Sequence, residues 1–218
     1  MKDTPITIEA ARALYDAGGG GHDFDHVLRV LATAERIAQA EGADLAVVRT
    51  AALLHDIGEN EDRARHHLLG AARARVLLAG QPADFVDAVC HAIEAHRFRA
   101  DPPPRTLEAQ VLSDADKLDA IGAIGIARAF AYAGSRDTAL WRTSWRAIAA
   151  ADEDAAHRAR HAPGDLGAAY TPVHEFVYKL DRIPERLYTA TARRIAAERQ
   201  AFMHTFFDRL DAEAQGEG

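Results

Sequence analysis

The chain has little of several features that define whole classes of protein. It has a single cysteine, Cys90, among 218 residues, which excludes an internal disulfide and a thiolate metal cluster. No apolar run approaches the ~18 residues that a membrane-spanning helix needs, and the first residues lack an apolar signal core. We therefore expect a cytoplasmic protein with no membrane contact.

Positive charge is also scarce. Lysine and arginine number 26 against 33 acidic residues, so the net charge is −7 and the isoelectric point is near 5.9. Such a chain is poorly suited to a polyanion, which argues against a nucleic acid polymer as the main partner. A small phosphate ester is still compatible with this charge, because a metal ion and a few cationic side chains are enough to hold it.

Apolar residues recur with the helical period through almost the whole chain, and no convincing strand pattern is present. We therefore predict an all-α helical bundle formed by a single domain over residues 1–218. Asp44 is expected to cap the third helix and Gly58 to end it. The predicted helices lie at about 7–16, 25–41, 45–57, 66–79, 83–96, 111–121, 122–130 and 189–214.

Residues 135–171 are polar and show the weakest helical pattern. Two interpretations stay open for this segment. It is either a lid over a binding site, since long irregular loops are often functional, or a variable surface insertion. The chain after it, residues 172–214, is expected to form C-terminal helices.

The most informative polar pair is His55-Asp56, which directly follows the apolar run 51–54. An imidazole and a carboxylate beside buried aliphatic side chains are costly unless something binds them. A divalent metal ion binds both ligand types. Neighbouring residues on a helix point ~100° apart, so the two side chains can face one ion only at a helix end, which Gly58 indicates.

Two more candidates, His26 and Asp116, lie in helical patterns on either side of that pair. A His…His-Asp…Asp set spread over ~90 residues indicates a metal site inside a helical bundle. Hydrolysis by a metal-activated water is then the leading interpretation. Arg29 follows His26 by three residues on the same helix face and is expected either to hold a phosphate or to pair with an acid beside the metal.

Three segments carry these residues: GHDFDHVLRV (21–30), ALLHDIGE (52–59) and LSDADKLDAIG (112–122). In this order they resemble the motifs of the HD-domain metal-dependent phosphohydrolase superfamily, and the resemblance spans about residues 20–135. Residues 173–182 and the long C-terminal helix are similar to a bacterial subgroup of small stand-alone HD hydrolases. Some members of that subgroup act on nucleoside triphosphates.

The resemblance implies an HD-domain bundle in which His26, His55, Asp56 and Asp116 bind a divalent metal ion. Asp116 is preferred to Asp114 because the ligand of the family follows alanine in an Ala-Asp-x-Leu element. Asp56 and Glu59 would be the catalytic residues, with Glu59 positioning or deprotonating the attacking water. The mixed nitrogen and oxygen ligands suit Mn²⁺, Mg²⁺, Co²⁺, Ni²⁺ or Fe²⁺, so the identity of the ion stays open.

His66 and His96 resemble the additional ligands of two-metal HD proteins. They are expected either to hold a second ion or to contact a phosphate of the substrate. Lys179 and Arg29 are the other expected substrate contacts, because a cationic side chain stabilises the charge that develops on a phosphoryl group.

The expected reaction is hydrolysis of a phosphate ester or anhydride in a small molecule, with a nucleotide as the substrate. Examples are a (deoxy)nucleoside triphosphate pyrophosphohydrolase and a nucleotide phosphatase. Two alternatives stay open. One is a di-iron oxygenase, which the use of both His66 and His96 as ligands would favour. The other is a metal- or nucleotide-binding sensor without turnover. The sequence does not predict the oligomeric state.

Overall fold

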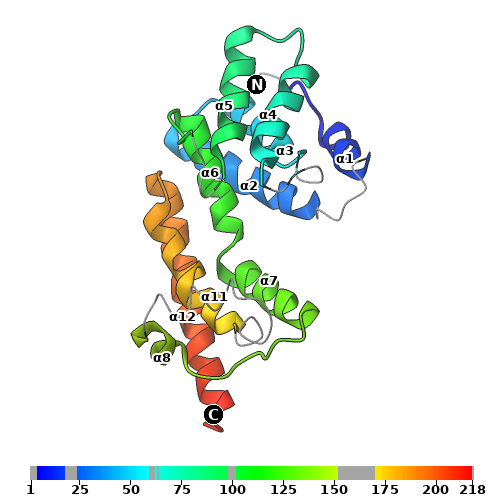
Figure 1. Cartoon of the computed structure of the whole chain (residues 1–218). Coiled ribbons are helices and arrows are strands. Elements are labelled where there is room, and N and C mark those ends of the chain that lie inside the picture. Colours follow the sequence, from blue (N-terminus) through cyan, green and yellow to red (C-terminus); the bar gives the residue numbers. More distant parts are fainter. Residues whose placement is uncertain are drawn as a thin grey trace. The chain divides into compact units, whose positions relative to one another are not determined.

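The computed structural model describes residues 4–17, 24–58, 62, 64–97, 102–151 and 170–217. All regular structure in these ranges is helical, which confirms the predicted all-α class (Figure 1). No helix among them is long and apolar enough to cross a lipid bilayer. The chain divides into two compact units, unit 1 with residues 1–119 and 187–193 and unit 2 with residues 120–186 and 194–218. The single domain over 1–218 stays a prediction.

Unit 1 is organised around one helix that is apolar on nearly all sides. Its helices are α1 (Ile8–Ala17), α2 (Phe24–Glu41), α3 (Leu45–Leu54), α4 (His66–Leu77), α5 (Ala83–Ala95) and α6 (Leu107–Asp119). The α3 helix packs against α2, α5 and α6, and its side chains are buried from Ala46 onward except at Arg49. A helix without a polar face has to lie at the centre of its bundle. The end of α3 is therefore a buried position.

The predicted cap of α3 is confirmed, and its predicted end is wrong. Asp44 accepts hydrogen bonds from the main-chain nitrogens of Ala46 and Val47 at 2.8 and 3.3 Å. The helix ends at Leu54 and not at Gly58, which lies outside the left-handed region that a glycine helix stop uses. Residues 55–58 instead form a turn.

A glycine is required at position 58 because α4 packs closely against it, and not because its φ angle is positive. A Cβ atom at this position would lie 2.6 Å from the carbonyl oxygen of His66 and 2.8 Å from the main-chain nitrogen of Gly70. Both atoms belong to α4. The missing side chain therefore lets the first turns of α4 lie directly against the turn that carries His55 and Asp56.

Replacing Gly58 by alanine is expected to lower the free energy of unfolding by about 1–3 kcal/mol, because the added methyl group overlaps the main chain of α4. Urea unfolding followed by circular dichroism measures the change. Gly134 is the matched control, since a Cβ there meets nothing within 4 Å. Gly134→Ala should leave stability unchanged or raise it by up to about 1 kcal/mol. A Gly58→Ala protein as stable as the wild type would contradict this packing.

Unit 2 has an aromatic core. Its elements are α7 (Gly122–Ser135), α8 (Trp145–Ala150), α11 (Pro172–Tyr178), the 3-10 helix η1 (Leu180–Arg186) and most of α12 (Ala190–Ala214). Phe176 of α11 stacks on Phe207 of α12 with ring centroids 4.2 Å apart, and Phe130 of α7 meets Phe206 edge-on at 5.8 Å. These aromatic pairs join three helices that are well separated in the sequence. The long C-terminal helix was predicted within one residue of its start.

The described part of the polar segment 135–171 is anchored to α12. The indole nitrogens of Trp141 and Trp145 donate to the carboxylates of Asp211 and Asp208, both at 2.7 Å. The polar sequence gave no signal for α8, which Ser144 caps by accepting from the main-chain nitrogen of Ala147. Residues 152–169 lie outside the described ranges. The choice between a lid and an insertion stays open.

Candidate metal centre

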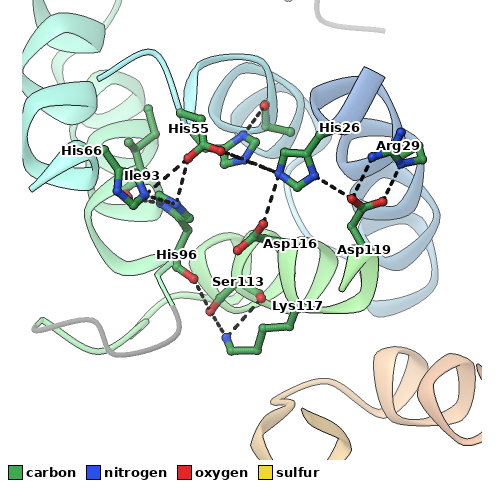
Figure 2. A network of polar contacts seen from close by, with 12 residues as sticks. His26, Arg29, His55, His66, Ile93, His96, Ser113, Asp116, Lys117 and Asp119 are labelled. Atoms are coloured by element: carbon green, nitrogen blue, oxygen red, sulfur yellow. Dashed lines mark hydrogen bonds and ion pairs between the residues drawn. The ribbon is translucent and has the colours of Figure 1, made fainter. Parts of the chain in front are cut away.

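Six of the predicted site residues lie close together in unit 1, most of them at helix ends (Figure 2). His55 and Asp56 follow the end of α3, and because the backbone leaves the helix after Leu54 their side chains face the same point. The other members also come from helix ends or from α6. His26 lies in the first turn of α2, His66 begins α4, His96 directly follows α5, and Asp116 belongs to α6.

Asp56 lies between two pairs of imidazole rings. Its Oδ2 atom is 3.2 Å from Nε2 of His55 and 3.7 Å from Nε2 of His26. Its Oδ1 atom is 3.4 Å from Nε2 of His66 and 3.5 Å from Nε2 of His96. One carboxylate thus serves two triads, His26–His55–Asp56 and Asp56–His66–His96. Asp116 joins the first group, with Oδ1 3.4 Å from Nε2 of His26.

The Nδ1 atoms of two rings, those of His55 and His96, show which ring nitrogen carries the hydrogen. Nδ1 of His55 is 2.8 Å from the carbonyl oxygen of Ala52, and Nδ1 of His96 is 2.6 Å from that of Ile93. A carbonyl oxygen only accepts, so each Nδ1 carries a hydrogen. In the neutral ring the lone pair of Nε2 is then directed at the centre, as a metal ligand requires.

These nitrogens lie too close together to be stable without a cation between them. Nε2 of His55 is 3.3 Å from Nε2 of His26, and Nε2 of His66 is 3.3 Å from Nε2 of His96. Two lone pairs at this separation repel each other unless a proton or a metal ion lies between them. Two ligands at right angles and ~2.1 Å from one octahedral ion lie ~3.0 Å apart, close to the spacing seen here. The residues present therefore fit a divalent metal ion.

The electrostatics of the cluster also favour positive charge. Burial disfavours the imidazolium of His26, but hydrogen bonds to Asp116 and Asp119 outweigh it and raise the pKa of His26 to about 10. Burial likewise opposes ionisation of Asp56, and the charge and hydrogen bonds of His55 and His96 outweigh it, so the pKa of Asp56 is well below its usual value. The site thus holds ionised carboxylates that attract either protons or a metal ion.

Comparison with known proteins gives the family. The model of the HD domain family matches residues 23–121. Over 202 residues the chain is 34% identical to the uncharacterized protein YpgQ of Bacillus subtilis, a match that covers 90% of this chain and 86% of that protein. The chain belongs to the HD superfamily.

Solved structures of similar proteins agree with this HD protein over nearly their full length. The crystal structure of Bacillus subtilis YpgQ in complex with ADP is 31% identical, with a TM-score of 0.68 and coverage of 94% of both chains. A predicted HD superfamily hydrolase of an uncultured Thermotogales bacterium is 30% identical, with a TM-score of 0.63 and coverage of 94% of this chain and 90% of that chain. The similarity supports a hydrolase.

A further similarity covers only about half of the HD protein. Ribonuclease Y of Chloroflexus aurantiacus is 37% identical over 110 residues, which are 49% of this chain and 20% of that enzyme. The shared part therefore represents a small fraction of the larger protein.

Asp114, the carboxylate beside the expected ligand Asp116, has a different position in this HD protein. It is fully buried and accepts three hydrogen bonds. The donors are the main-chain nitrogen of Tyr188 at 2.9 Å, the main-chain nitrogen of Thr189 at 2.8 Å and the hydroxyl of Thr189 at 2.8 Å. It thus ties the start of α12 to α6. Of the two carboxylates, Asp116 lies next to His26, and its role as a metal ligand stays a prediction.

Two residues that support the site carried little signal in the sequence. The hydroxyl of Tyr15 in α1 donates to the carbonyl oxygen of Leu53 and accepts from the main-chain nitrogen of Asp56, both at 3.3 Å. Asp119 accepts from Nδ1 of His26 at 2.7 Å. Asp119 lies one helical turn after Asp116, a spacing that places both on one face of α6. Nothing in the sequence around Tyr15 indicates its role.

The other three predicted site residues are Arg29, Lys179 and Glu59. Arg29 pairs with Asp119, the acid that also contacts Nδ1 of His26, and its expected role as a substrate contact stays a prediction. Lys179 lies in unit 2, where its Nζ donates to Glu175 at 2.7 Å. Glu59 lies outside the described residues, so its catalytic role stays a prediction.

Proposed function

We propose that this HD protein is a metal-dependent phosphohydrolase that acts on a phosphate ester or anhydride of a small molecule, with a nucleotide as the substrate. The observation that carries the proposal is the facing pair of Nε2 atoms of His26 and His55, 3.3 Å apart beside the carboxylate of Asp56. The complex of YpgQ with ADP supports a nucleotide as the ligand class.

A divalent ion in this site would polarise a phosphoryl oxygen and lower the pKa of the attacking water. We propose that His26, His55, Asp56 and Asp116 hold the ion. His55 is fully buried and His96 is 2% exposed, so these two imidazoles are shielded from bulk water. Low exposure strengthens every charge interaction in the site. Glu59 is proposed to position the water, and Lys179 to stabilise charge on the phosphate.

His66 and His96 have two proposed roles that an ion count distinguishes. Together with Oδ1 of Asp56 they form a second set of three ligand atoms within 4.8 Å of one another. Two bound ions per chain would assign them as ligands, with Asp56 shared between the ions. One bound ion would leave them as contacts to a phosphate of the substrate.

The test is a release assay for phosphate and pyrophosphate. Metal-stripped protein is re-supplied with Mn²⁺, Mg²⁺, Co²⁺, Ni²⁺ or Fe²⁺ and incubated with nucleoside and deoxynucleoside mono-, di- and triphosphates. A short single-stranded RNA is tested separately because of the similarity to Ribonuclease Y, and its cleavage is followed by gel electrophoresis, since breaking an internal phosphodiester bond releases no free phosphate. Asp56→Ala is the inactive control.

We expect metal-dependent turnover of a nucleotide that is lost in Asp56→Ala, and the released product names the bond that is broken. Cleavage of RNA with no nucleotide turnover would contradict the proposed substrate class. No turnover with any ion, although metal binds, would contradict the hydrolase and favour a sensor.

A second candidate function is a di-iron oxygenase. The second triad, Asp56–His66–His96, is the observation that favours it, because a dinuclear centre needs ligands on both sides of a shared carboxylate. Two tightly bound irons per chain and oxygen consumption with an organic phosphonate or polyol would support it. Nucleotide hydrolysis with Mn²⁺ in the absence of oxygen uptake would oppose it.

Metal binding is expected to release about one proton per ion at neutral pH. The pKa of His26 is raised to about 10, so without metal its ring is charged at neutral pH and Nε2 carries a proton. An ion has to displace that proton, and the apparent affinity should therefore rise with pH until His26 is deprotonated. Calorimetric titration of Mn²⁺ in two buffers of different ionisation enthalpy measures the release. Identical heats in both buffers would contradict it.

A further inference from the structure

His26 is held differently from His55 and His96. The Nδ1 atoms of His55 and His96 each contact a carbonyl oxygen three residues earlier in their own helix. Nδ1 of His26 instead contacts a side-chain carboxylate, that of Asp119, on a helix 93 residues further along the chain. A main-chain carbonyl holds a ring at a fixed position but supplies only a dipole. A carboxylate supplies a full negative charge at the same position.

Asp119 is itself held in place. It is 5% exposed, and the guanidinium of Arg29 donates to both of its oxygens, from Nε to Oδ1 at 2.7 Å and from Nη2 to Oδ2 at 3.1 Å. Two parallel hydrogen bonds of this kind fix the plane of a carboxylate. His26 and Arg29 are three residues apart in α2, so one turn of α2 presents both donors to one acid of α6 (Figure 2).

We propose that Asp119, oriented by Arg29, is the positioning residue that directs Nε2 of His26 into the metal centre and sets how strongly His26 binds the ion. This inference rests on the metal-dependent function proposed above. An ionised acceptor on Nδ1–H raises the electron density at Nε2 and makes the ring a stronger ligand. Arg29 then acts through Asp119 and is not itself a contact to the substrate phosphate.

The two roles of Arg29 predict different results. A residue that acts through Asp119 changes metal affinity, and its effect disappears once Asp119 is replaced. A residue that contacts a phosphate changes the Michaelis constant for the substrate and leaves metal affinity unchanged. The pair Asp119–Arg29 therefore suits a double-mutant cycle with metal affinity as the readout.

The experiment measures the dissociation constant of Mn²⁺ by electron paramagnetic resonance for the wild type, Asp119→Asn, Arg29→Met and the double variant. Asp119→Asn is expected to weaken Mn²⁺ binding by about 10–100-fold. Arg29→Met should weaken it in the wild type and have no further effect in Asp119→Asn. Asp87→Asn is the matched control, because Asp87 forms an exposed pair with Arg75 at 2.7 Å away from the centre. It should bind Mn²⁺ as the wild type does.

A metal-independent readout separates positioning from general damage to the fold. In the metal-free wild type, the proton on Nδ1 of His26 should give a downfield, slowly exchanging NMR resonance, which is lost or moves upfield in Asp119→Asn. If Asp119→Asn does not fold, Arg29→Lys keeps the charge, loses the two parallel hydrogen bonds and supplies the same two measurements.

Mn²⁺ affinity in Asp119→Asn equal to that of the wild type would overturn the inference and leave the proposed function intact. A raised Michaelis constant in Arg29→Met at unchanged Mn²⁺ affinity would overturn the role given to Arg29. A wild-type protein that binds none of the tested ions would overturn the proposed function, and the inference with it.

Discussion

Replacing Asp56 by asparagine is expected to reduce metal-dependent turnover by at least about a thousandfold, the equivalent of about 4 kcal/mol of transition-state stabilisation. The two oxygens of Asp56 face different imidazole pairs, Oδ2 toward His26 and His55 and Oδ1 toward His66 and His96. Asparagine keeps the volume and removes the negative charge. Loss of this one charge should lower the affinity of the centre for every ion that it binds.

Turnover and the number of metal ions retained after dialysis are measured for the wild type and for Asp56→Asn. His66→Gln is the matched comparison, because His66 belongs only to the second triad. If two ions bind, His66→Gln should lose one and Asp56→Asn both. If a single ion binds between His26 and His55, only Asp56→Asn should lose it. Asp56→Asn that keeps its full metal content and turnover would contradict the central position of this carboxylate.

Replacing Asp114 by alanine is expected to lower the free energy of unfolding by about 3–5 kcal/mol, because it leaves several buried donors without an acceptor. Asp114 is fully buried and accepts from the main-chain nitrogens of Tyr188 and Thr189 and from the hydroxyl of Thr189. Each unsatisfied buried donor costs about 1–3 kcal/mol. The same hydrogen bonds hold the first turn of α12 against α6 within unit 1.

Chemical denaturation and thermal melting measure this loss. Asp87→Ala is a suitable control, since Asp87 is largely exposed and its pair with Arg75 is expected to contribute less than about 1 kcal/mol. Asp114→Asn should lie between alanine and the wild type, because its amide oxygen still accepts. Equal stability of Asp114→Ala and Asp87→Ala would refute the role given to Asp114.

The local elements of the fold followed from residue patterns. Asp44 was a recognisable cap because a carboxylate precedes a long apolar helix, and the structure has it accepting from Ala46 and Val47. The end of α3 was misplaced because Gly58 was interpreted as a helix stop. Gly58 is needed because the main chain of α4 passes too close for a side chain there, and that contact between segments cannot be read from sequence spacing.

The candidate ligands were also named in advance, but their grouping was not. His66 and His96 lie at the outer ends of two successive helices, α4 and α5, so the sequence left open whether they turn inward. In the structure their Nε2 atoms are 3.3 Å apart and both face Asp56. The contact of Asp119 with His26 was not predicted, because spacing along α6 does not show which of its acids lies next to α2.

The sequence by itself determined the helical class, the positions of most helices, the absence of an internal disulfide and the residue types of a candidate site with mixed nitrogen and oxygen ligands. Each of these depends on neighbours along the chain or on composition. The tertiary structure decided which carboxylate faces the histidines, that Asp56 is shared between two triads, and that Asp119 and Arg29 hold His26. These depend on where separate helices end relative to one another in unit 1, and that is set by packing between segments far apart in the sequence.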